Sequence, residues 1–222
     1  AIGMEVGYDA AKDFTPITQF LRRPAVLVVN ASLNVRTVAE LVALVKAKGG
    51  AMSYGTPSVA HFCHFATEVF NRRVGIKVPA VPYKGEAPMI TDLIGGQVDY
   101  GFGFATTVDP YIKSGRLNAL ATTGAVRSPQ LPDVPTFTEL GMPEVEMTIW
   151  TGMAGPAGLP PEIVERLQVE LGKILRNPAI KARREFADSE IIASKPEAFR
   201  AFLAAERVRW AKLVKETGIK VQ

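Results

Sequence analysis

The residues with the clearest chemical potential lie in a polar loop, residues 53–61, which reads Ser-Tyr-Gly-Thr-Pro-Ser-Val-Ala-His. The pattern predicts a short strand at 52–54 and a helix at 60–71. Unpaired N–H groups and the dipole at a helix N-terminus attract anions, and Gly55 lets the backbone approach a ligand closely. The loop therefore predicts an anion site; in the simpler alternative, Ser58 only caps the helix.

Two further loops also stand between a predicted strand and a predicted helix: Tyr83-Lys84-Gly85 and Phe104-Ala105-Thr106-Thr107. In open α/β sheets, the edge that carries such loops collects ligands. Tyr83 and Thr106 are therefore candidate pocket residues. In the alternative, the first loop is a turn with a solvated Lys84, and Thr106 or Thr107 is a helix cap.

A metal site is a second possible use of the first loop, because His61 and His64 are spaced to share one face of a helix. Cys63 lies between them and Glu68 one turn further on, but no carboxylate pair or further histidine completes a ligand set. We therefore expect no metal and no cofactor. The favoured interpretation is a buried His64 bonded to the backbone and an inert, half-buried thiol at Cys63.

The sequence lacks the common catalytic motifs: it has no Gly-x-Ser-x-Gly elbow, no Walker loop and no Gly-x-Gly-x-x-Gly after a strand. Both histidines lie on one short predicted helix, so a Ser-His-Asp triad would require a distant serine and a distant acid. We therefore expect binding rather than catalysis, with an α/β enzyme of unrecognised type as an alternative.

The composition is that of an ordinary globular protein: 222 residues, 47% hydrophobic and 22% charged, enough for one large domain or two small ones. A formal charge of +4 suits anionic small molecules. Basic and aromatic residues form no compact mixed patch, which argues against nucleic acid. No apolar run is long enough for a membrane-spanning helix, and a single cysteine excludes an internal disulfide.

The elements that would position these loops follow from the alternation of short apolar runs with amphipathic stretches. This alternation predicts a mostly parallel sheet with helices on both faces. The expected strands are 25–29, 52–54, 77–81, 98–102 and 117–123, and the expected helices are 37–48, 60–71, 86–94 and 107–113. A capping box at Thr37 and Glu40 supports the first helix.

The second half of the chain has a different pattern. Residues 124–147 are rich in proline and predict a surface loop with one short helix at 136–140. Helices are expected at 162–175, 178–187 and 196–216, the first stacking Ile163, Leu167, Leu171 and Ile174 on one face. A capping box at Ser194 and Glu197 is expected to open the last helix.

Four short strings carry a family resemblance. They are Val81-Pro82-Tyr83-Lys84-Gly85, Gly95-Gly96-Gln97-Val98-Asp99, Arg127-Ser128-Pro129 and Leu131-Pro132-Asp133-Val134-Pro135-Thr136. In order, spacing and identity they resemble the solute-binding proteins of tripartite tricarboxylate transporters, also called the Bordetella uptake gene family. The likeness begins at Tyr8 and runs to the C-terminus.

The resemblance implies an α/β fold of the periplasmic-binding-protein type II, with two lobes joined by crossing strands. The first lobe would comprise residues 1–30 and 148–222, and the second, ligand-binding lobe residues 31–147. The implied protein is a periplasmic monomer that captures a small organic acid (a di- or tricarboxylate, or an aromatic acid) between the lobes and hands it to membrane permease subunits. A soluble sensor subunit for a signalling receptor is an alternative.

The resemblance also implies site residues. In the family the first loop reads Tyr-Gly-Ser-x-Gly-x-Gly-Ser with a later His, and it holds a ligand carboxylate. This chain departs from that pattern with Ser58 and Ala60 in place of glycines and His61 in place of Ser or Thr. The implied carboxylate contacts are Gly55, Thr56, Ser58 and His61, mainly through backbone N–H groups, and the implied pocket residues are Tyr83, Thr106 and Trp150. His61 could bond the carboxylate, narrow the pocket or stack on an aromatic acid.

Family members carry an additional N-terminal segment that supplies the first strands of lobe one and a loop that holds one end of the ligand. No counterpart is visible in this sequence. We therefore expect the first lobe to lack its N-terminal segment, to expose a sheet edge and apolar helix faces, and to leave half of the binding site absent.

Overall fold

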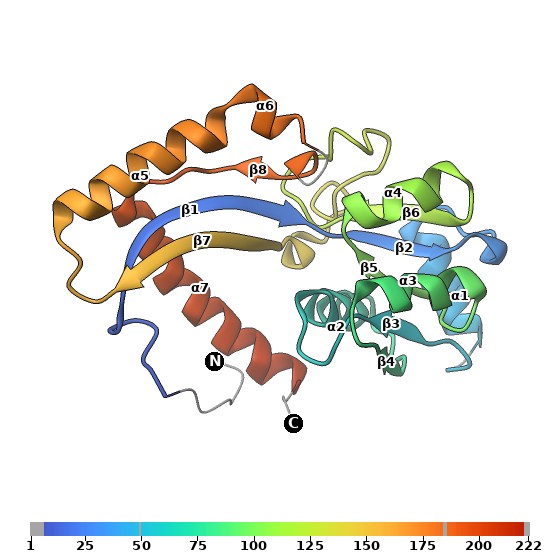
Figure 1. The fold of residues 1–222 in the computed structure, drawn as a ribbon. Coiled ribbons are helices and arrows are strands. Elements are labelled where there is room, and N and C mark those ends of the chain that lie inside the picture. The colour runs from blue at the N-terminus through green and yellow to red at the C-terminus, as the bar shows by residue number, and fades with distance from the viewer. Residues whose placement is uncertain (1–6, 49, 184–185, 220–222) are drawn as a thin grey trace. The chain divides into compact units, whose positions relative to one another are not determined.

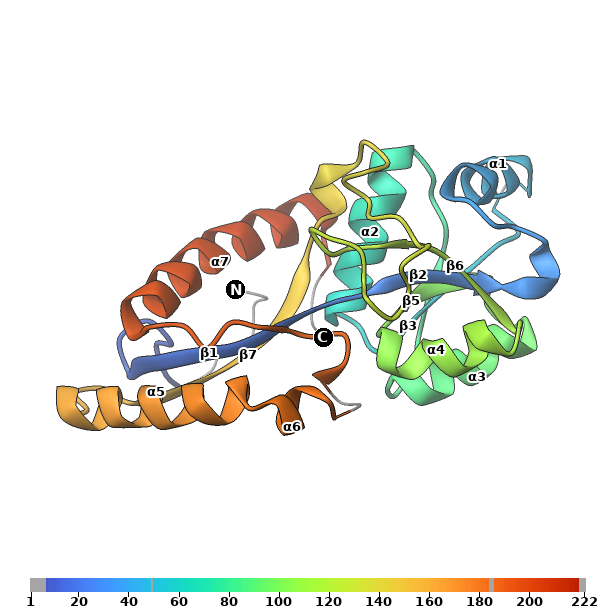
Figure 2. The ribbon, with the colours of Figure 1, turned by 90° about the horizontal axis from the view of Figure 1, so that it is seen from above.

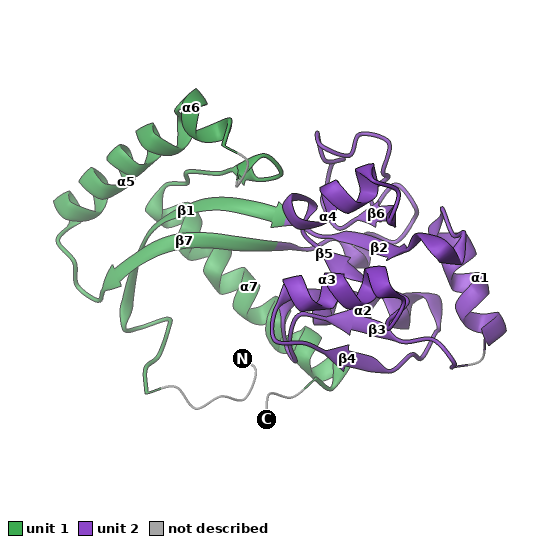
Figure 3. Cartoon of the chain, turned by 45° about the vertical axis from the view of Figure 1, so that its right-hand side comes forward, with its two compact units in different colours: residues 1–23, 149–222 green, residues 24–148 purple. Residues whose placement is uncertain are grey.

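The structure is a computed structural model that describes residues 7–48, 50–183 and 186–219. It divides into two compact units: unit 1 contains residues 1–23 and 149–222, and unit 2 contains residues 24–148 (Figure 3). The lobe boundaries predicted from the sequence lie at 30/31 and 147/148. They differ from the boundaries of the two units mainly at strand β2 (Val26–Asn30), which the structure places in unit 2. The reason is that β2 forms its hydrogen bonds within the unit 2 sheet.

Within the described residues, the unit 2 sheet has five strands in the order β4-β3-β5-β2-β6 (Figure 1). The strands other than β2 are β3 (Tyr54–Thr56), β4 (Ala80–Pro82), β5 (Tyr100–Gly103) and β6 (Leu117–Thr122). Strand β3 pairs in parallel with β4 and β5, whereas β2 runs antiparallel to β5 and β6. The sheet is therefore mixed, and the expectation of a mostly parallel sheet was wrong in this detail. A buried strand is the same apolar run in either direction, so its sequence does not reveal its direction.

The helices of unit 2 lie close to their expected positions. They are α1 (Val38–Lys48), α2 (Phe62–Val74), α3 (Glu86–Gly95) and α4 (Ala105–Lys113). The capping box of α1 is confirmed, because Glu40 N–H donates to Thr37 Oγ1 at 3.2 Å and Thr37 N–H donates to Glu40 Oε2 at 3.1 Å. Phe102 on β5 lies between Phe70 of α2 and Phe137, with ring centroids 6.5 and 5.8 Å away, so aromatic packing joins α2 to the sheet.

One expected helix, at 136–140, and one expected helix cap, at Ser194, were wrong for related reasons. Residues 136–140 form turns, although Thr136 and Glu139 exchange the hydrogen bonds of a capping box, at 2.7 and 3.0 Å. Only a short 3-10 helix, η2 (Pro143–Val145), follows. Ser194 does not cap the last helix, because its hydroxyl accepts the Gln19 N–H of strand β1 at 3.0 Å. Polar side chains that the local sequence pattern assigns to helix ends thus bond instead to a strand (Ser194) or within a turn (Thr136 and Glu139).

The described part of unit 1 has a sheet of three strands in the order β7-β1-β8. Its elements are β1 (Phe14–Pro24), β7 (Thr148–Pro156), β8 (Glu190–Ile191), α5 (Pro161–Arg176), α6 (Pro178–Lys181) and α7 (Pro196–Thr217). Helices α5 and α7 lie on opposite sides of β1 and β7 (Figure 2). Helix α6 is shorter than the expected 178–187, of which residues 184–185 fall outside the described chain.

Helix α5 has an apolar stripe that unit 1 leaves uncovered. Ile163, Leu167 and Ile174 are 41%, 37% and 54% exposed, whereas Val164 and Leu175 on the other face are buried. The stripe has the spacing that the sequence indicated. Within unit 1, the side of α5 that carries Val164 and Leu175 is the buried one.

Candidate functional site

The candidate site lies where three parallel strands of unit 2 end. Because β3, β4 and β5 run in parallel, their carboxyl ends meet at one edge of the sheet, and helices α2, α3 and α4 begin there (Figure 1). Residues 56–61, 83–85 and 104 form this loop edge. Its first two loops are bonded together, since Tyr83 N–H donates to Thr56 O at 2.9 Å and Gly85 N–H donates to Pro57 O at 2.8 Å.

The first loop is held in shape by its own polar groups. The buried Thr56 hydroxyl donates to Ser58 O at 3.2 Å. Ala60 has a φ of +59°, a conformation that is costly for a residue with a Cβ. Its N–H donates to His64 Nδ1 at 3.1 Å, which supports that conformation. Ser58 and Val59 remain exposed at the tip of the loop.

His61, not Ser58, is the N-cap of α2, so the simpler interpretation of Ser58 was wrong. His61 Nδ1 accepts the Cys63 N–H at 3.2 Å. A neutral imidazole that accepts at Nδ1 carries its proton at Nε2. Burial, and then the neighbouring His64, lower the pKa of His61 below its ordinary value. His61 is therefore a neutral donor, and its Nε2–H has no hydrogen-bond partner within the described residues.

The expectation for His64 is confirmed: it is buried, and its Nδ1 bonds to the backbone of Ala60. Cys63 is fully rather than half buried, and this burial raises the pKa of its thiol well above the ordinary value. The hydroxyl of Tyr54 donates to Glu68 Oε1. In the described chain, no three His, Cys, Asp or Glu side chains lie close enough together to hold a metal ion.

Gly55 has a packing role that the sequence did not reveal. It lies within β3 between β4 and β5, and a Cβ at this position would come within 2.8 Å of Met89 Cγ. A Cβ at Gly101 of β5 would come within 2.8 Å of Gly55 O. The paired glycines therefore let the strands and α3 approach closely. Ligand contact by Gly55 and by the buried Thr56 stays a prediction.

In the second loop, the side chain of Tyr83 turns toward helix α3. Its hydroxyl donates to Asp92 Oδ2 at 2.9 Å, and burial together with Asp92 raises the pKa of Tyr83 to about 12. The ring packs against the apolar cluster below α3. Helix α3 begins after Gly85, which has a φ of +119°. This conformation favours glycine, and glycine has no side chain that could cap the helix.

The third loop corrects the expected cap of α4. Its N-cap is Phe104, not Thr106 or Thr107. The bonds are supplied from α3: Phe104 N–H donates to Glu86 Oε1 at 2.7 Å, and the Thr107 hydroxyl donates to Glu86 Oε2 at 3.0 Å. Sequence reasoning missed Glu86. An acidic residue in the first turn of a helix can be recognised in a sequence. The sequence does not reveal that the side chain of this residue reaches the next helix.

Trp150, the remaining predicted pocket residue, belongs to strand β7 of unit 1. Its ring meets Phe199 and Phe202 of α7 edge-on, with centroids 5.6 and 5.5 Å away. These contacts account for Trp150 as a packing residue of unit 1. Its contact with a ligand stays a prediction.

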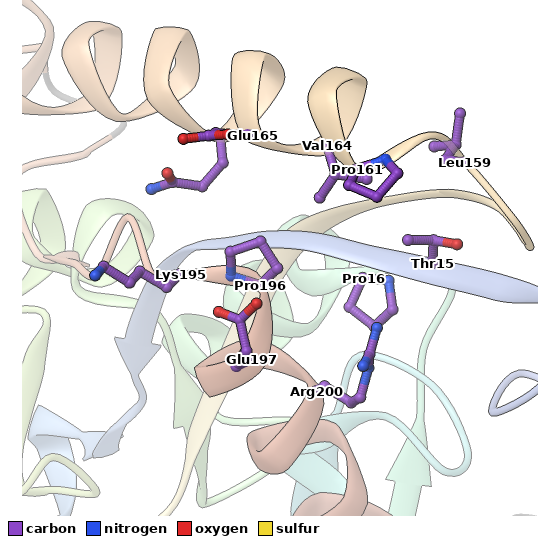
Figure 4. A pocket seen from close by; sticks show the side chains of 11 residues that line it. Thr15, Pro16, Leu159, Pro161, Val164, Glu165, Lys195, Pro196, Glu197 and Arg200 are labelled. Carbon is purple, nitrogen blue, oxygen red and sulfur yellow. The ribbon is translucent and has the colours of Figure 1, made fainter.

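Unit 1 also has a pocket of about 480 Å³ that no sequence motif marks. It lies between α5, β1 and the start of α7 (Figure 4). Its charged lining residues are Glu165, Lys195, Glu197 and Arg200. None of the predicted site residues lines it. Equal numbers of acidic and basic side chains give it no preference for an anion.

Comparison with known proteins places this geometry in a family. Residues 3–219 match the family described as "Tripartite tricarboxylate transporter family receptor". The chain is 32% identical to Protein BugT of Bordetella pertussis over 98% of its own length and 67% of that protein. The chain covers 63% and 64% of two other relatives, so it spans about two thirds of the length of these three proteins.

Solved structures confirm the predicted α/β fold of the periplasmic-binding-protein type. One is R. palustris Rpa4515 with adipate, 34% identical, with a TM-score of 0.85 over 97% of this chain and 72% of that chain. Another is the periplasmic binding protein BugD, 30% identical, with a TM-score of 0.84 over 97% and 73%. In the described residues, no helix combines the length and apolarity needed to span a membrane. The chain belongs to the tripartite tricarboxylate transporter receptor family.

Proposed function

We propose that this protein is a periplasmic solute-binding protein that captures a small organic carboxylate and delivers it to the permease subunits of a tripartite tricarboxylate-type transporter. Family membership over residues 3–219 and the likeness to an adipate-bound relative support the proposal. The single observation that carries it is the loop edge of unit 2. Three helices begin at that edge of the sheet, and beside them lies the His61 Nε2–H, which no described residue bonds.

A carboxylate is the ligand that this edge suits best. The first N–H groups of a helix have no partners within the helix, and the helix dipole favours negative charge there. In α2 the Cys63 N–H is already bonded to His61 Nδ1, which leaves the Phe62 N–H ahead of it for a ligand. Ser58 and His61 keep exposed surface and are the proposed direct contacts. Gly55 and Thr56, which are buried, set the position of the loop. Tyr83 and Thr106 are the proposed walls of the pocket within unit 2. No covalent step or cofactor is required.

Isothermal titration calorimetry against a panel of organic acids tests capture. We expect saturable binding without product formation. His61→Asn keeps a side chain that caps helices but removes the ring donor, so affinity should fall about tenfold, as for a lost hydrogen bond to a charged group. Lys46→Ala, at an exposed position of α1, is the control and should bind like the parent protein. Unchanged affinity in His61→Asn, or turnover of the ligand, would contradict the proposal.

Delivery to a permease is tested separately. Proteoliposomes that contain the large and small permease subunits should take up the labelled acid only when this protein is added as a monomer to the outside. Uptake at the same rate without the protein would refute the transport role while leaving ligand capture intact.

A further inference from the structure

The first loop of the candidate site contains a turn that its own sequence does not favour. Residues 58–61 form this turn, and the His61 N–H closes it by donating to Ser58 O at 3.3 Å. Ala60, the third residue of the turn, has a φ of +59°. Turns that need a positive φ at this position normally carry glycine or asparagine there. The turn therefore depends on contacts from outside it.

The contact that supports the turn comes from helix α2. The Ala60 N–H donates to His64 Nδ1 at 3.1 Å. The ring of His64 is buried beside Tyr54 of β3, with ring centroids 6.1 Å apart, and the Tyr54 hydroxyl donates in turn to Glu68. The imidazole is thus held against the strand that ends at the site, and its hydrogen bond passes this position on to the loop.

The same turn carries the two side chains proposed to contact the ligand. Ser58 begins the turn and is exposed, and His61 ends it as the N-cap of α2. Provided that the proposed function is correct, we propose that His64 is a positioning residue for ligand capture, because its acceptance of the Ala60 N–H sets this turn. Protonation of His64 releases the turn and weakens capture.

Protonation acts on the hydrogen bond directly, because it changes His64 Nδ1 from an acceptor into a donor. The Ala60 N–H would then face another N–H and lose its partner. In the described chain, the titratable groups that face His64 are Tyr54 from β3 and, from α2 itself, His61 and Glu68. Burial lowers the pKa of His64 more than the Glu68 carboxylate raises it, so the ring is neutral at pH 7 and the turn is held.

Nuclear magnetic resonance of the ligand-free protein tests the hydrogen bond itself. We expect a nitrogen–nitrogen coupling across the bond between the Ala60 amide and His64 Nδ1. As His64 becomes protonated, the coupling should disappear, and the protection of the Ala60 amide against hydrogen exchange should fall about tenfold. An Ala60 amide that does not respond to the titration of His64 would overturn the proposal, whether or not a ligand binds.

Calorimetry with benzoate between pH 7.5 and pH 5 tests the consequence for capture. Benzoate has one carboxylate, which stays ionised over this range. The affinity of the parent protein should fall about threefold to tenfold toward the lower pH. His64→Asn offers an amide oxygen in place of Nδ1 but does not titrate, so it should bind like the parent at pH 7.5 and lose most of this fall. His61 is present in both proteins, so the difference between them isolates His64.

A double-mutant cycle separates positioning from a general loss of stability. His64→Leu removes the acceptor and should weaken benzoate binding about tenfold at pH 7.5. Glycine adopts a positive φ without support, so in an Ala60→Gly background the same substitution should cost about threefold or less. Equal losses in the two backgrounds, or a His64→Leu protein that binds like the parent, would refute the positioning role. Lys46→Ala is the control and should bind like the parent protein.

The two proposals fail in different ways. If the parent protein binds none of the organic acids, the proposed function is refuted and the positioning role with it, even where the ligand-free spectra show the Ala60–His64 bond. If the acids bind but their affinity does not depend on His64, capture stands and only the positioning role is refuted.

Discussion

In the described part of unit 2, helices cover the sheet, and the side chains of Phe70, Phe102 and Tyr100 are completely buried. Unit 1 has long helices too, but β8 contributes only two residues to its sheet, and Ile174 of α5 is 54% exposed. The helices of both units have amphipathic sequence patterns. They lead to burial only where the sheet is wide enough to receive them. The firmly packed unit is the one that carries the loop edge.

Truncating one apolar side chain in each unit is the strongest way to break this comparison. Phe102→Ala in unit 2 should cost about 3–5 kcal/mol of unfolding free energy, because it leaves a cavity between the rings of Phe70 and Phe137. Ile174→Ala in unit 1 should cost less than about 0.5 kcal/mol, because the side chain is exposed. Urea unfolding monitored by hydrogen exchange in each unit measures the loss of stability in both variants. A large effect of Ile174→Ala would show that its stripe is covered in solution.

Strand spacing in unit 2 gives the next largest effect. Gly101→Ala places a Cβ 2.8 Å from Gly55 O and should cost about 1–3 kcal/mol, because β3 and β5 must move apart. Gly95→Ala is a matched control at the end of α3, where nothing lies within 4 Å of an added Cβ. It should be neutral or stabilise by up to about 1 kcal/mol. Equal losses in both variants would contradict the packing role of Gly101.

Between pH 7 and pH 5, acid should act on unit 2 rather than unit 1, because both histidines of the chain lie in unit 2. Burial lowers the pKa of His61 and of His64 below 6.5 in the folded protein. The unfolded chain therefore binds protons first as the pH falls. Stability is fully present above the unfolded value and is lost as the pH falls from there toward the folded values. Hydrogen exchange between pH 7 and pH 5 should show this in unit 2 and not in unit 1. His61→Asn should reduce the slope of stability against pH. An unchanged slope would exclude His61 as a source of this pH dependence.

The smallest expected effect concerns the backbone of the first loop. Ala60→Gly relieves the positive φ and should stabilise unit 2 by about 0.5–1 kcal/mol. The midpoint of urea unfolding measures this gain. Thr107→Gly, at a position inside α4 without a positive φ, should instead destabilise. A loss of stability in Ala60→Gly would mean that the loop does not hold the conformation described.

Local rules predicted those features that depend on neighbours in sequence. The α1 capping box at Thr37 and the positions of the unit 2 helices are of this kind. Features set by partners far along the chain were missed. Ser194 was taken up by β1, Glu86 reached across to α4, and β2 paired antiparallel. His61 as a cap of α2 escaped because histidine is not among the residues that favour this position. The sequence of the loops was thus enough to locate the candidate site, but the positions of its charged groups could be seen only in the folded structure.

Backbone amide spectra of the protein during a titration with benzoate test the central claim most directly. The account predicts saturable shifts concentrated at residues 56–62 and 83–87, where α2 and α3 begin, with no new chemical species in solution. Shifts that cluster in the unit 1 pocket near Arg200 instead, or spectra that do not change up to the highest benzoate concentration, would contradict it.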